Sequence, residues 1–151
     1  MNLTLKSKSG LSGSALKVIA MISMVIDHVA LYLMEQGTLL YETMRCIGRI
    51  AFPVFAFLIA EGFIHTRNRY RYFFTLLGFA VISEIPWYLL NGADGTHNVM
   101  FTLALGVATL MVLENFLQRS LVLGFLWTFG MAGLAFWFGV DYEWRGILVI
   151  V

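Results

Sequence analysis

Charged residues are scarce in this sequence. They make up 13% of its 151 residues, whereas 60% are hydrophobic, and the mean hydropathy is +0.81. Soluble domains are about a quarter charged. A soluble fold of this size would have to hide almost all of its apolar surface, and small domains cannot do so. The sequence therefore predicts an integral membrane protein.

The sequence also lacks the residues that define several other protein classes. A formal net charge of +1 excludes the basic surplus of a nucleic-acid-binding protein. The single cysteine, Cys46, excludes an internal disulfide framework and a multi-cysteine metal site. There is no glycine-rich phosphate loop, no HExxH sequence and no cluster of metal ligands. We therefore expect neither nucleic acid nor a metal ion as a partner.

Long apolar runs divide the chain. A spanning helix needs ~20 mostly apolar residues, and five such segments are predicted, at residues 15–34, 45–65, 72–90, 99–118 and 121–140. A sixth opens at Gly146 and has six residues before the sequence ends. It is either cut short, which we prefer, or a stub that packs without spanning.

The predicted fold is thus an all-α, polytopic transmembrane helix bundle of five full spans and the start of a sixth. Residues 1–14 are expected to form a polar cytoplasmic tail. Residues 15–151 are expected to form a single transmembrane helical domain, truncated at its C-terminal end.

Lysine and arginine predict the orientation of the bundle, because they concentrate in cytoplasmic loops. If the N-terminus lies inside, seven of these lysine and arginine residues are on the inner side and three are on the outer side. The inner residues are Lys6, Lys8, Lys17, Arg67, Arg69, Arg71 and Arg119, and the outer ones are Arg45, Arg49 and Arg145. We therefore expect a cytoplasmic N-terminus.

Several ionisable side chains fall inside the predicted spans, where each costs at least ~2.5–3.5 kcal/mol on insertion. They form an outer and an inner layer about the bilayer midplane. The outer layer holds Asp27, His28, Arg49 and Glu84, and the inner layer holds Lys17, Glu61 and Glu114. Such groups are expected to face one another or a water-filled cavity. Pro53 and Pro86 are expected to kink the second and third spans beside them.

Lys17 and His28 form one stripe on the first predicted helix. They are eleven residues apart, so they lie within ~20° of one face and ~16 Å apart. That length suits a thin, extended substrate with an anionic end inside. Histidine can take a proton from a nucleophile near neutral pH. Asp27 is rotated ~100° from His28, so we expect it to partner another helix, or to orient His28 only where the helix is distorted.

Structural roles compete with these functional ones. An intramembrane histidine often only makes an interhelical hydrogen bond. Arg49 with Glu84, and Glu61 with Lys17, are candidate neutralising pairs, and the same role suits Glu114.

Residues near the predicted membrane surface have their own alternative. Arg67, Arg69 and Arg71 are explained as well by the positive-inside bias as by phosphate binding. His65 and His97 are expected to be solvated.

Five segments in one order resemble the TraX family of bacterial inner-membrane proteins, named for the N-terminal acetylation of conjugative pilin. They are LKVIAMISMVIDH (16–28), RIAFPVFAFLIAEGFIHTRN (49–68), FAVISEIPWYLL (79–90), NVMFTLALG (98–106) and DYEWRGIL (141–148). The resemblance covers nearly the whole chain from residue 16. The family is in turn similar to wider integral-membrane acyltransferases, some of which carry an Arg/Lys-x10-His stripe that Lys17 and His28 match.

This resemblance implies a membrane-embedded acetyltransferase in the bacterial inner membrane. Its co-substrate would be cytoplasmic acetyl-CoA, and its acceptor an outer-face group, either the N-terminal amine of pilin or another surface molecule. His28 would act as general base or transient acyl carrier, supported by Asp27 and Glu84.

The cationic side chains receive roles from the same resemblance. Lys17, Arg67, Arg69 and Arg71 would meet the CoA phosphates. Arg45 and Arg49 would lie near the acceptor or the developing oxyanion.

Two other classes of function remain open. Buried His, Asp and Glu also mark small transporters and proton relays, and a third possibility is a non-catalytic membrane assembly factor. Binding or hydrolysis of acetyl-CoA by the purified protein separates the enzyme from both.

Overall fold

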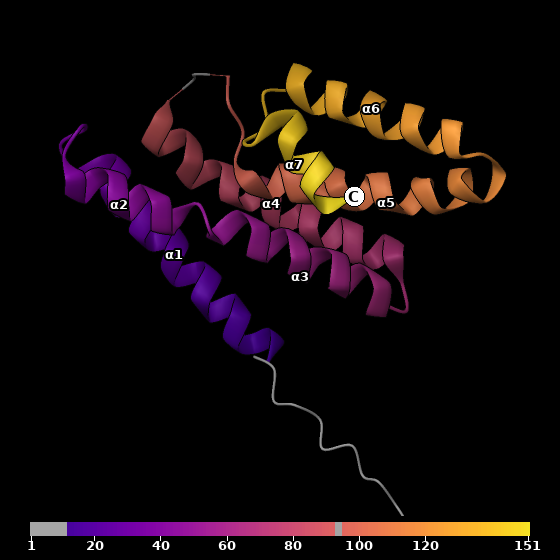
Figure 1. Ribbon diagram of the computed structural model, residues 1–151, viewed down its shortest axis with the longest axis horizontal. Coiled ribbons are helices and arrows are strands. Elements are labelled where there is room, and N and C mark those ends of the chain that lie inside the picture. The colour runs from indigo at the N-terminus through magenta and orange to yellow at the C-terminus, as the bar shows by residue number, and fades with distance from the viewer. Residues whose placement is uncertain (1–11, 93–94) are drawn as a thin grey trace, which may run out of the picture. The chain divides into compact units, whose positions relative to one another are not determined.

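The computed structural model describes residues 12–92 and 95–151, and these residues form helices joined by short connections (Figure 1). The helices are α1 (Gly13–Leu33), α2 (Leu39–Gly48), α3 (Ala51–His65), α4 (Arg69–Asn91), α5 (Val99–Arg119), α6 (Leu121–Trp137) and α7 (Glu143–Ile150). The predicted all-α fold is confirmed. Residues 1–11 of the predicted polar tail lie outside the described residues.

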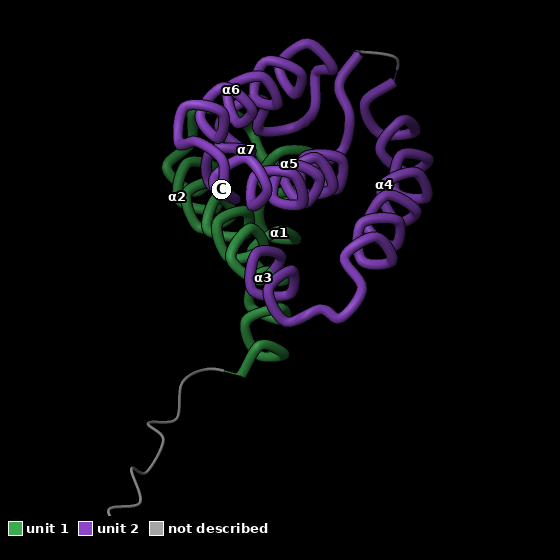
Figure 2. Tube along the Cα trace, turned by 90° about the vertical axis from the view of Figure 1, so that its right-hand side faces the viewer, with its two compact units in different colours: residues 1–58 green, residues 59–151 purple. Residues whose placement is uncertain are grey.

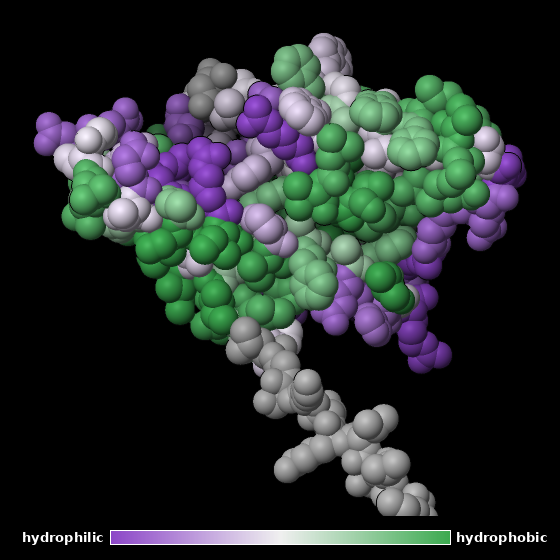
Figure 3. Space-filling model, in the orientation of Figure 1, coloured by the Kyte–Doolittle hydropathy of each residue, from purple (hydrophilic) through white to green (hydrophobic). Residues whose placement is uncertain are grey.

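Four helical segments are long and apolar enough to cross a membrane. They are Gly13–Leu33, Leu39–His65, Arg69–Asn91 and Val99–Arg119. The fifth predicted span is the apolar helix α6, which has 17 residues. Apolar side chains cover much of the face drawn in Figure 3. The exposed large apolar residues of α6 include Leu121, Val122, Phe125, Leu126 and Phe129. Because lipid solvates such side chains, the chain is a multi-pass membrane protein.

The second span is interrupted, which differs from the single helix predicted at 45–65. The helix begins at Leu39 and stops at Gly48, and α3 starts at Ala51. Pro53 explains the position of the break. Proline cannot donate a hydrogen bond to the carbonyl of Arg49, four residues earlier, and its ring crowds that carbonyl. Pro53 thus lies in the first turn of α3, where its missing N–H is tolerated, and a break replaces the predicted kink.

Two other boundaries differ from the prediction. α4 begins at Arg69, three residues early, because the Asn68 side chain accepts a hydrogen bond from the Arg71 amide at 2.9 Å and caps the helix. α6 ends at Trp137 instead of residue 140, since Gly139 adopts a φ of 61° in the connection that follows. α4 continues as a helix through Pro86.

Two compact units make up the chain, residues 1–58 and residues 59–151 (Figure 2). In the first unit, α1 packs against α2. Gly48 permits this approach, because a Cβ at Gly48 would collide with the carboxyl group of Asp27.

The second unit is built around α5, which packs on α4, α6 and α7. Two apolar clusters hold these helices together. One comprises Phe63, Leu76, Ala104 and Val107, and the other Met131, Ala132, Ala135, Val140 and Ile147. The segment expected from Gly146 is α7, whose eight residues extend about 12 Å. It packs through the buried Ile147 and Ile150.

Candidate functional site

The Lys17–His28 stripe requires a helix without interruption between these two residues, and α1 is continuous from Gly13 to Leu33. Its first turn is stabilised by Ser12, whose Oγ accepts a hydrogen bond from the Ala15 amide at 3.2 Å. Lys17 is exposed, and His28 is half-buried. The two side chains therefore share a face of α1 with three helical turns between them.

The ring of His28 is oriented by its own helix. Its Nδ1 lies 2.8 Å from the carbonyl oxygen of Met24. Because a carbonyl oxygen can only accept, Nδ1 carries the hydrogen and Nε2 carries the lone pair of the neutral ring. The aromatic ring of Tyr32 lies alongside, with the ring centroids 6.0 Å apart. His28 thus offers one defined proton-accepting atom.

Asp27 pairs with a residue of another helix, as its position on α1 predicted. Its Oδ2 accepts a hydrogen bond from Arg45 Nη1 of α2 at 2.5 Å. The two side chains are 21% and 22% exposed, so the ion pair is largely shielded. The other oxygen, Oδ1, is buried and has no hydrogen-bond partner among the described residues. Asp27 therefore joins α1 to α2 and leaves one acceptor atom unused.

Arg45 is thereby engaged by Asp27, whereas Arg49, the other cation expected near the acceptor, is exposed at the break between α2 and α3. Both belong to the same unit as Asp27 and His28.

The three arginines expected to meet CoA phosphates differ in their surroundings. Arg69 pairs with Glu114 of α5, and its guanidinium lies 4.6 Å from the ring centroid of Phe63. Arg67 and Arg71 are exposed. Glu114 therefore has the neutralising role considered above, and its partner is the positive charge of Arg69. Arg69 and Arg71 belong to the first turn of α4, whereas the span predicted at 72–90 would have left both before the helix.

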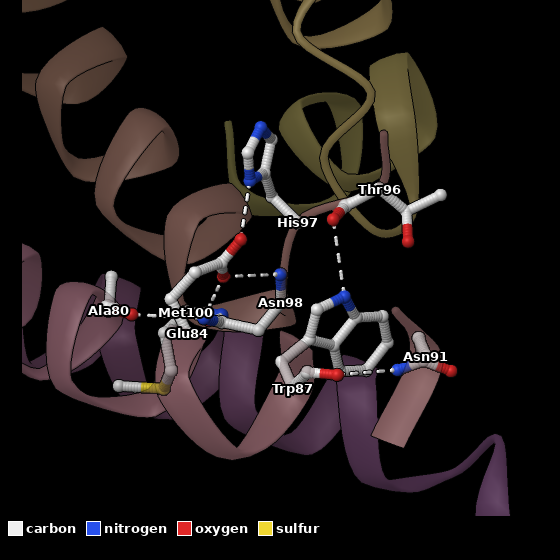
Figure 4. A network of polar contacts seen from close by, with 8 residues as sticks. All are labelled: Ala80, Glu84, Trp87, Asn91, Thr96, His97, Asn98 and Met100. Carbon is white, nitrogen blue, oxygen red and sulfur yellow. Dashed lines mark hydrogen bonds and ion pairs between the residues drawn. The ribbon is translucent and has the colours of Figure 1, made fainter. Parts of the chain in front are cut away.

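Glu84 lies at the centre of a polar network in the second unit (Figure 4). Its Oε1 lies 2.5 Å from Nδ1 of His97. Its Oε2 accepts hydrogen bonds from Asn98, at 2.6 Å from Nδ2 and 3.3 Å from the amide. Asn98 Nδ2 also donates to the Ala80 carbonyl at 2.9 Å, and Asn98 Oδ1 caps α5 by accepting from the Met100 amide. Both carboxylate oxygens of Glu84 are therefore occupied.

The side chain of His97 is 42% exposed, so it is partly solvated, but it also has partners in the protein that the sequence did not predict. Besides its contact with Glu84, its backbone amide donates to the Gly139 carbonyl at 3.1 Å, and its carbonyl accepts from the Asp141 amide at 3.0 Å. His97 is therefore held between α4 and the connection that joins α6 to α7.

An apolar cavity of about 320 Å³ adjoins this network. Its walls come from α4, α5 and the end of α6, together with His97. The lining residues are Phe73, Leu77, His97, Phe101, Ala104, Leu105, Phe138 and Val140. His97 is the one ionisable side chain in this wall.

The family model for TraX protein matches residues 12–151. The chain belongs to the TraX family. Among the curated relatives, it is 37% identical to a probable fimbrial assembly protein, FimC, of Dichelobacter nodosus serogroup H1, over 82% of this chain and 55% of the relative. It is 33% identical to an uncharacterised protein of Rickettsia prowazekii (strain Madrid E), over 89% of this chain and 50% of the relative.

This TraX-family chain thus spans about half the length of the curated relatives it matches. No solved structure matches it.

The residues expected to act in this TraX-family chain belong to both units. In the first unit, Asp27 pairs with Arg45, and His28 follows Asp27 on α1. In the second, Glu84 meets His97. Sequence reasoning missed His97 and Asn98. Helical periodicity gave no signal for them, because His97 lies in the connection between α4 and α5 and Asn98 is the N-cap of α5.

Proposed function

We propose that this chain is an integral-membrane acetyltransferase that moves an acetyl group from cytoplasmic acetyl-CoA to an acceptor on the outer face of the bacterial inner membrane. The leading acceptor is the amino terminus of a pilin. The observation that carries the proposal is His28, whose Nδ1 is held by the Met24 carbonyl, so that Nε2 is its basic atom. Membership of the TraX family and the relative named as a probable fimbrial assembly protein support it.

The proposed transfer needs one base and a way to bind a long anionic donor. The acceptor amine attacks the thioester carbonyl, an N–C bond forms, and the amine proton passes to Nε2 of His28. The C–S bond then breaks, and the proton moves from His28 to the leaving thiolate, which gives the amide and free CoA. Lys17, ~16 Å along α1, is suited to the phosphates at the other end of the CoA molecule.

The neighbouring side chains have supporting roles in this proposal. Asp27 positions Arg45 through their ion pair, and Arg49 is the cation available to a developing oxyanion. Arg67 and Arg71 join Lys17 at the CoA phosphates, together with Arg69 to the extent that its pair with Glu114 allows. Glu84 acts through His97, whose Nδ1 contacts one of the carboxylate oxygens of Glu84.

The test compares two histidines that have the same local hydrogen bond. Nδ1 of His65 lies 2.9 Å from the carbonyl oxygen of Glu61, four residues earlier. Nδ1 of His28 makes the same contact with the carbonyl oxygen of Met24. We expect His28→Ala to lower transfer to a peptide with a free amino terminus by on the order of 10²–10⁴, with acetyl-CoA binding kept. His65→Ala should change neither. Mass spectrometry of the peptide measures the transfer, and a folded, fully active His28→Ala protein would exclude the assigned role.

Lys17 provides the second half of the test. Lys17→Ala should raise KM for acetyl-CoA with little change in kcat, because a cation on phosphate contributes equally to ground and transition states. Lys17→Arg should restore binding. If both residues only join helices, the two alanine variants should instead lose thermal stability together, without this division between binding and turnover.

The Asp27 oxygen without a partner and the Glu84–His97 pair favour one alternative, a proton relay, since such groups also form proton pathways in membranes. Proton flux across vesicles that contain the purified protein, without acetyl-CoA, is the measurement that favours this alternative. Absence of both flux and acetyl transfer would favour a non-catalytic assembly factor.

A further inference from the structure

The apolar cavity of the second unit has no part in the proposed transfer. We propose that it is a lipid-binding site, which takes one acyl chain of a phospholipid from the surrounding bilayer. All of its lining residues lie within residues 59–151, so the site belongs to one unit. The inference rests on the membrane class of the chain, and it does not depend on the proposed acetyltransferase function.

The lining of the cavity excludes water as its occupant. Among the lining residues, His97 alone has a polar side chain, and its Nδ1 is engaged by Glu84. A buried water needs about two to four polar partners, whereas apolar cavities stay dry and bind apolar molecules. If a cavity of about 320 Å³ stayed empty, its walls would lose their van der Waals contacts. The cavity therefore favours an apolar occupant.

The depth of the cavity indicates which apolar molecule is within reach. Leu77, in its wall, lies about 12 Å along α4 from Arg69 and about 21 Å from Asn91. Leu77 is thus within the hydrocarbon core that α4 is long enough to cross. Acyl chains are the solvent at that depth, so an acyl chain is the expected occupant.

Phe138 indicates where a chain would enter. It lines the cavity and is also 48% exposed, so the cavity reaches the surface of the protein at the end of α6. The neighbouring Trp137 is exposed too, and its ring meets that of Phe138 edge-on, with the ring centroids 5.1 Å apart. By contrast, the lining residues Ala104 and Val140 are buried. A chain that enters beside Phe138 therefore passes from an apolar surface to a buried wall.

Backbone hydrogen bonds fix the wall of the cavity. The His97 amide donates to the Gly139 carbonyl at 3.1 Å, and the His97 carbonyl accepts from the Asp141 amide at 3.0 Å. Phe138 and Val140 flank Gly139, so these bonds hold both lining residues beside the connection that leads into α5. A site that is formed in advance loses less conformational entropy when its ligand binds.

The volume of the cavity limits how much lipid it holds. A dry protein cavity of about 150 Å³ takes one benzene ring. The cavity here is about twice as large, so it takes roughly a dozen methylene carbons. That is most of one acyl chain, with no room for a second. The second chain and the headgroup would stay among the surrounding lipids.

The test uses the protein in phospholipid vesicles whose lipids carry a photoreactive diazirine near the end of one acyl chain. After illumination, mass spectrometry locates the lipid adducts. We expect adducts on Ala104, because it lines the cavity but is only 2% exposed. Adducts on the exposed Phe125 of α6 measure ordinary contact with bulk lipid. Adducts on such exposed side chains alone would overturn the proposed site.

Two tryptophan variants separate the cavity from the rest of the surface. Leu77→Trp fills the cavity, so it should lower the adducts on Ala104 by on the order of 10-fold or more, since a chain would then overpack the space. Leu90→Trp adds the same side chain at an exposed position of the same helix, and it should change nothing. Adducts on Phe125 should be equal in all three proteins. Unchanged adducts on Ala104 in the Leu77→Trp protein would refute the site.

Ala104→Leu replaces Leu77→Trp if that variant does not fold, and the adducts are then measured on Phe101, another lining residue.

A photoreactive amino acid in place of Phe138 tests for other occupants. It should form adducts with lipid, since Phe138 lies where the cavity meets the surface. Adducts with a second copy of the chain, or with residues of the first unit, would instead show that protein covers the opening. Either of these results would exclude the lipid site.

Discussion

The partner of Nδ1 determines what each histidine can do in this chain. His28 and His65 donate to backbone carbonyls of their own helices, whereas His97 donates to the carboxylate of Glu84. All three rings therefore have Nε2 as their basic atom. A carboxylate partner also stabilises the positive charge that an imidazole gains with a proton, which a carbonyl does less well. At the residue scale, His97 thus differs from the other two histidines in having a carboxylate partner.

The arginines near the start of α4 lead to a prediction at the same scale. Arg69→Ala removes an ion pair and a contact with the Phe63 ring, so it should lower the free energy of unfolding by roughly 0.5–1.5 kcal/mol, since the pair is partly exposed. Arg67→Ala and Arg71→Ala should leave stability unchanged and weaken CoA binding. Thermal unfolding and CoA titration of the three variants distinguish a loss of stability from a loss of CoA binding. A normal Tm with weak CoA binding in Arg69→Ala would contradict it.

At the scale of elements, the break between α2 and α3 shapes the first unit. Pro53 stops the helix from running through Arg49 and Ile50, and Gly48 at the end of α2 brings the backbone against the Asp27 carboxyl group. The ion pair between Asp27 and Arg45 then closes the contact between α1 and α2. A broken span beside charged side chains is how membrane proteins build polar sites at bilayer depth.

A methyl group added at Gly48 tests the packing of α1 against α2. Gly48→Ala should destabilise the protein by about 1–3 kcal/mol, because its Cβ would collide with the Asp27 side chain. Gly78→Ala is the control within α4, where a Cβ meets nothing within 4 Å. It should be neutral or stabilise by up to about 1 kcal/mol, since alanine favours the helix. Thermal unfolding of both variants is the measurement, and a Gly48→Ala protein as stable as Gly78→Ala would refute the close contact.

At the scale of the whole molecule, the balance of apolar and charged residues determines its relation to the bilayer. α4 has 23 residues and extends about 34 Å, enough to cross the hydrocarbon core. Its two ends differ in charge, since the connection before it carries Arg67 and its first turn carries Arg69 and Arg71. The positive-inside rule therefore predicts that α4 begins on the cytoplasmic side.

Cysteine labelling tests this orientation. Arg67→Cys and Thr96→Cys, each in a Cys46→Ser background, place one thiol before α4 and one after it, at positions exposed in the structure. In intact cells, a membrane-impermeant maleimide should label residue 96 and spare residue 67 until the membrane is opened. Labelling of residue 67 from outside would reverse the orientation of the chain.

Properties that depend on neighbours along the chain could be predicted from the sequence alone. Hydropathy predicted the membrane class and the helices in their order, and helical periodicity predicted both the Lys17–His28 stripe and an interhelical partner for Asp27. The sequence did not reveal that this partner is Arg45, that the second span is broken at Arg49, or that Glu84 meets His97. Those features depend on which groups approach one another when helices pack. His97 lies between α4 and α5, and it contacts Glu84 of α4 while the α6–α7 connection holds its backbone. Local periodicity determines the face on which a side chain lies, but only tertiary packing decides what it meets there.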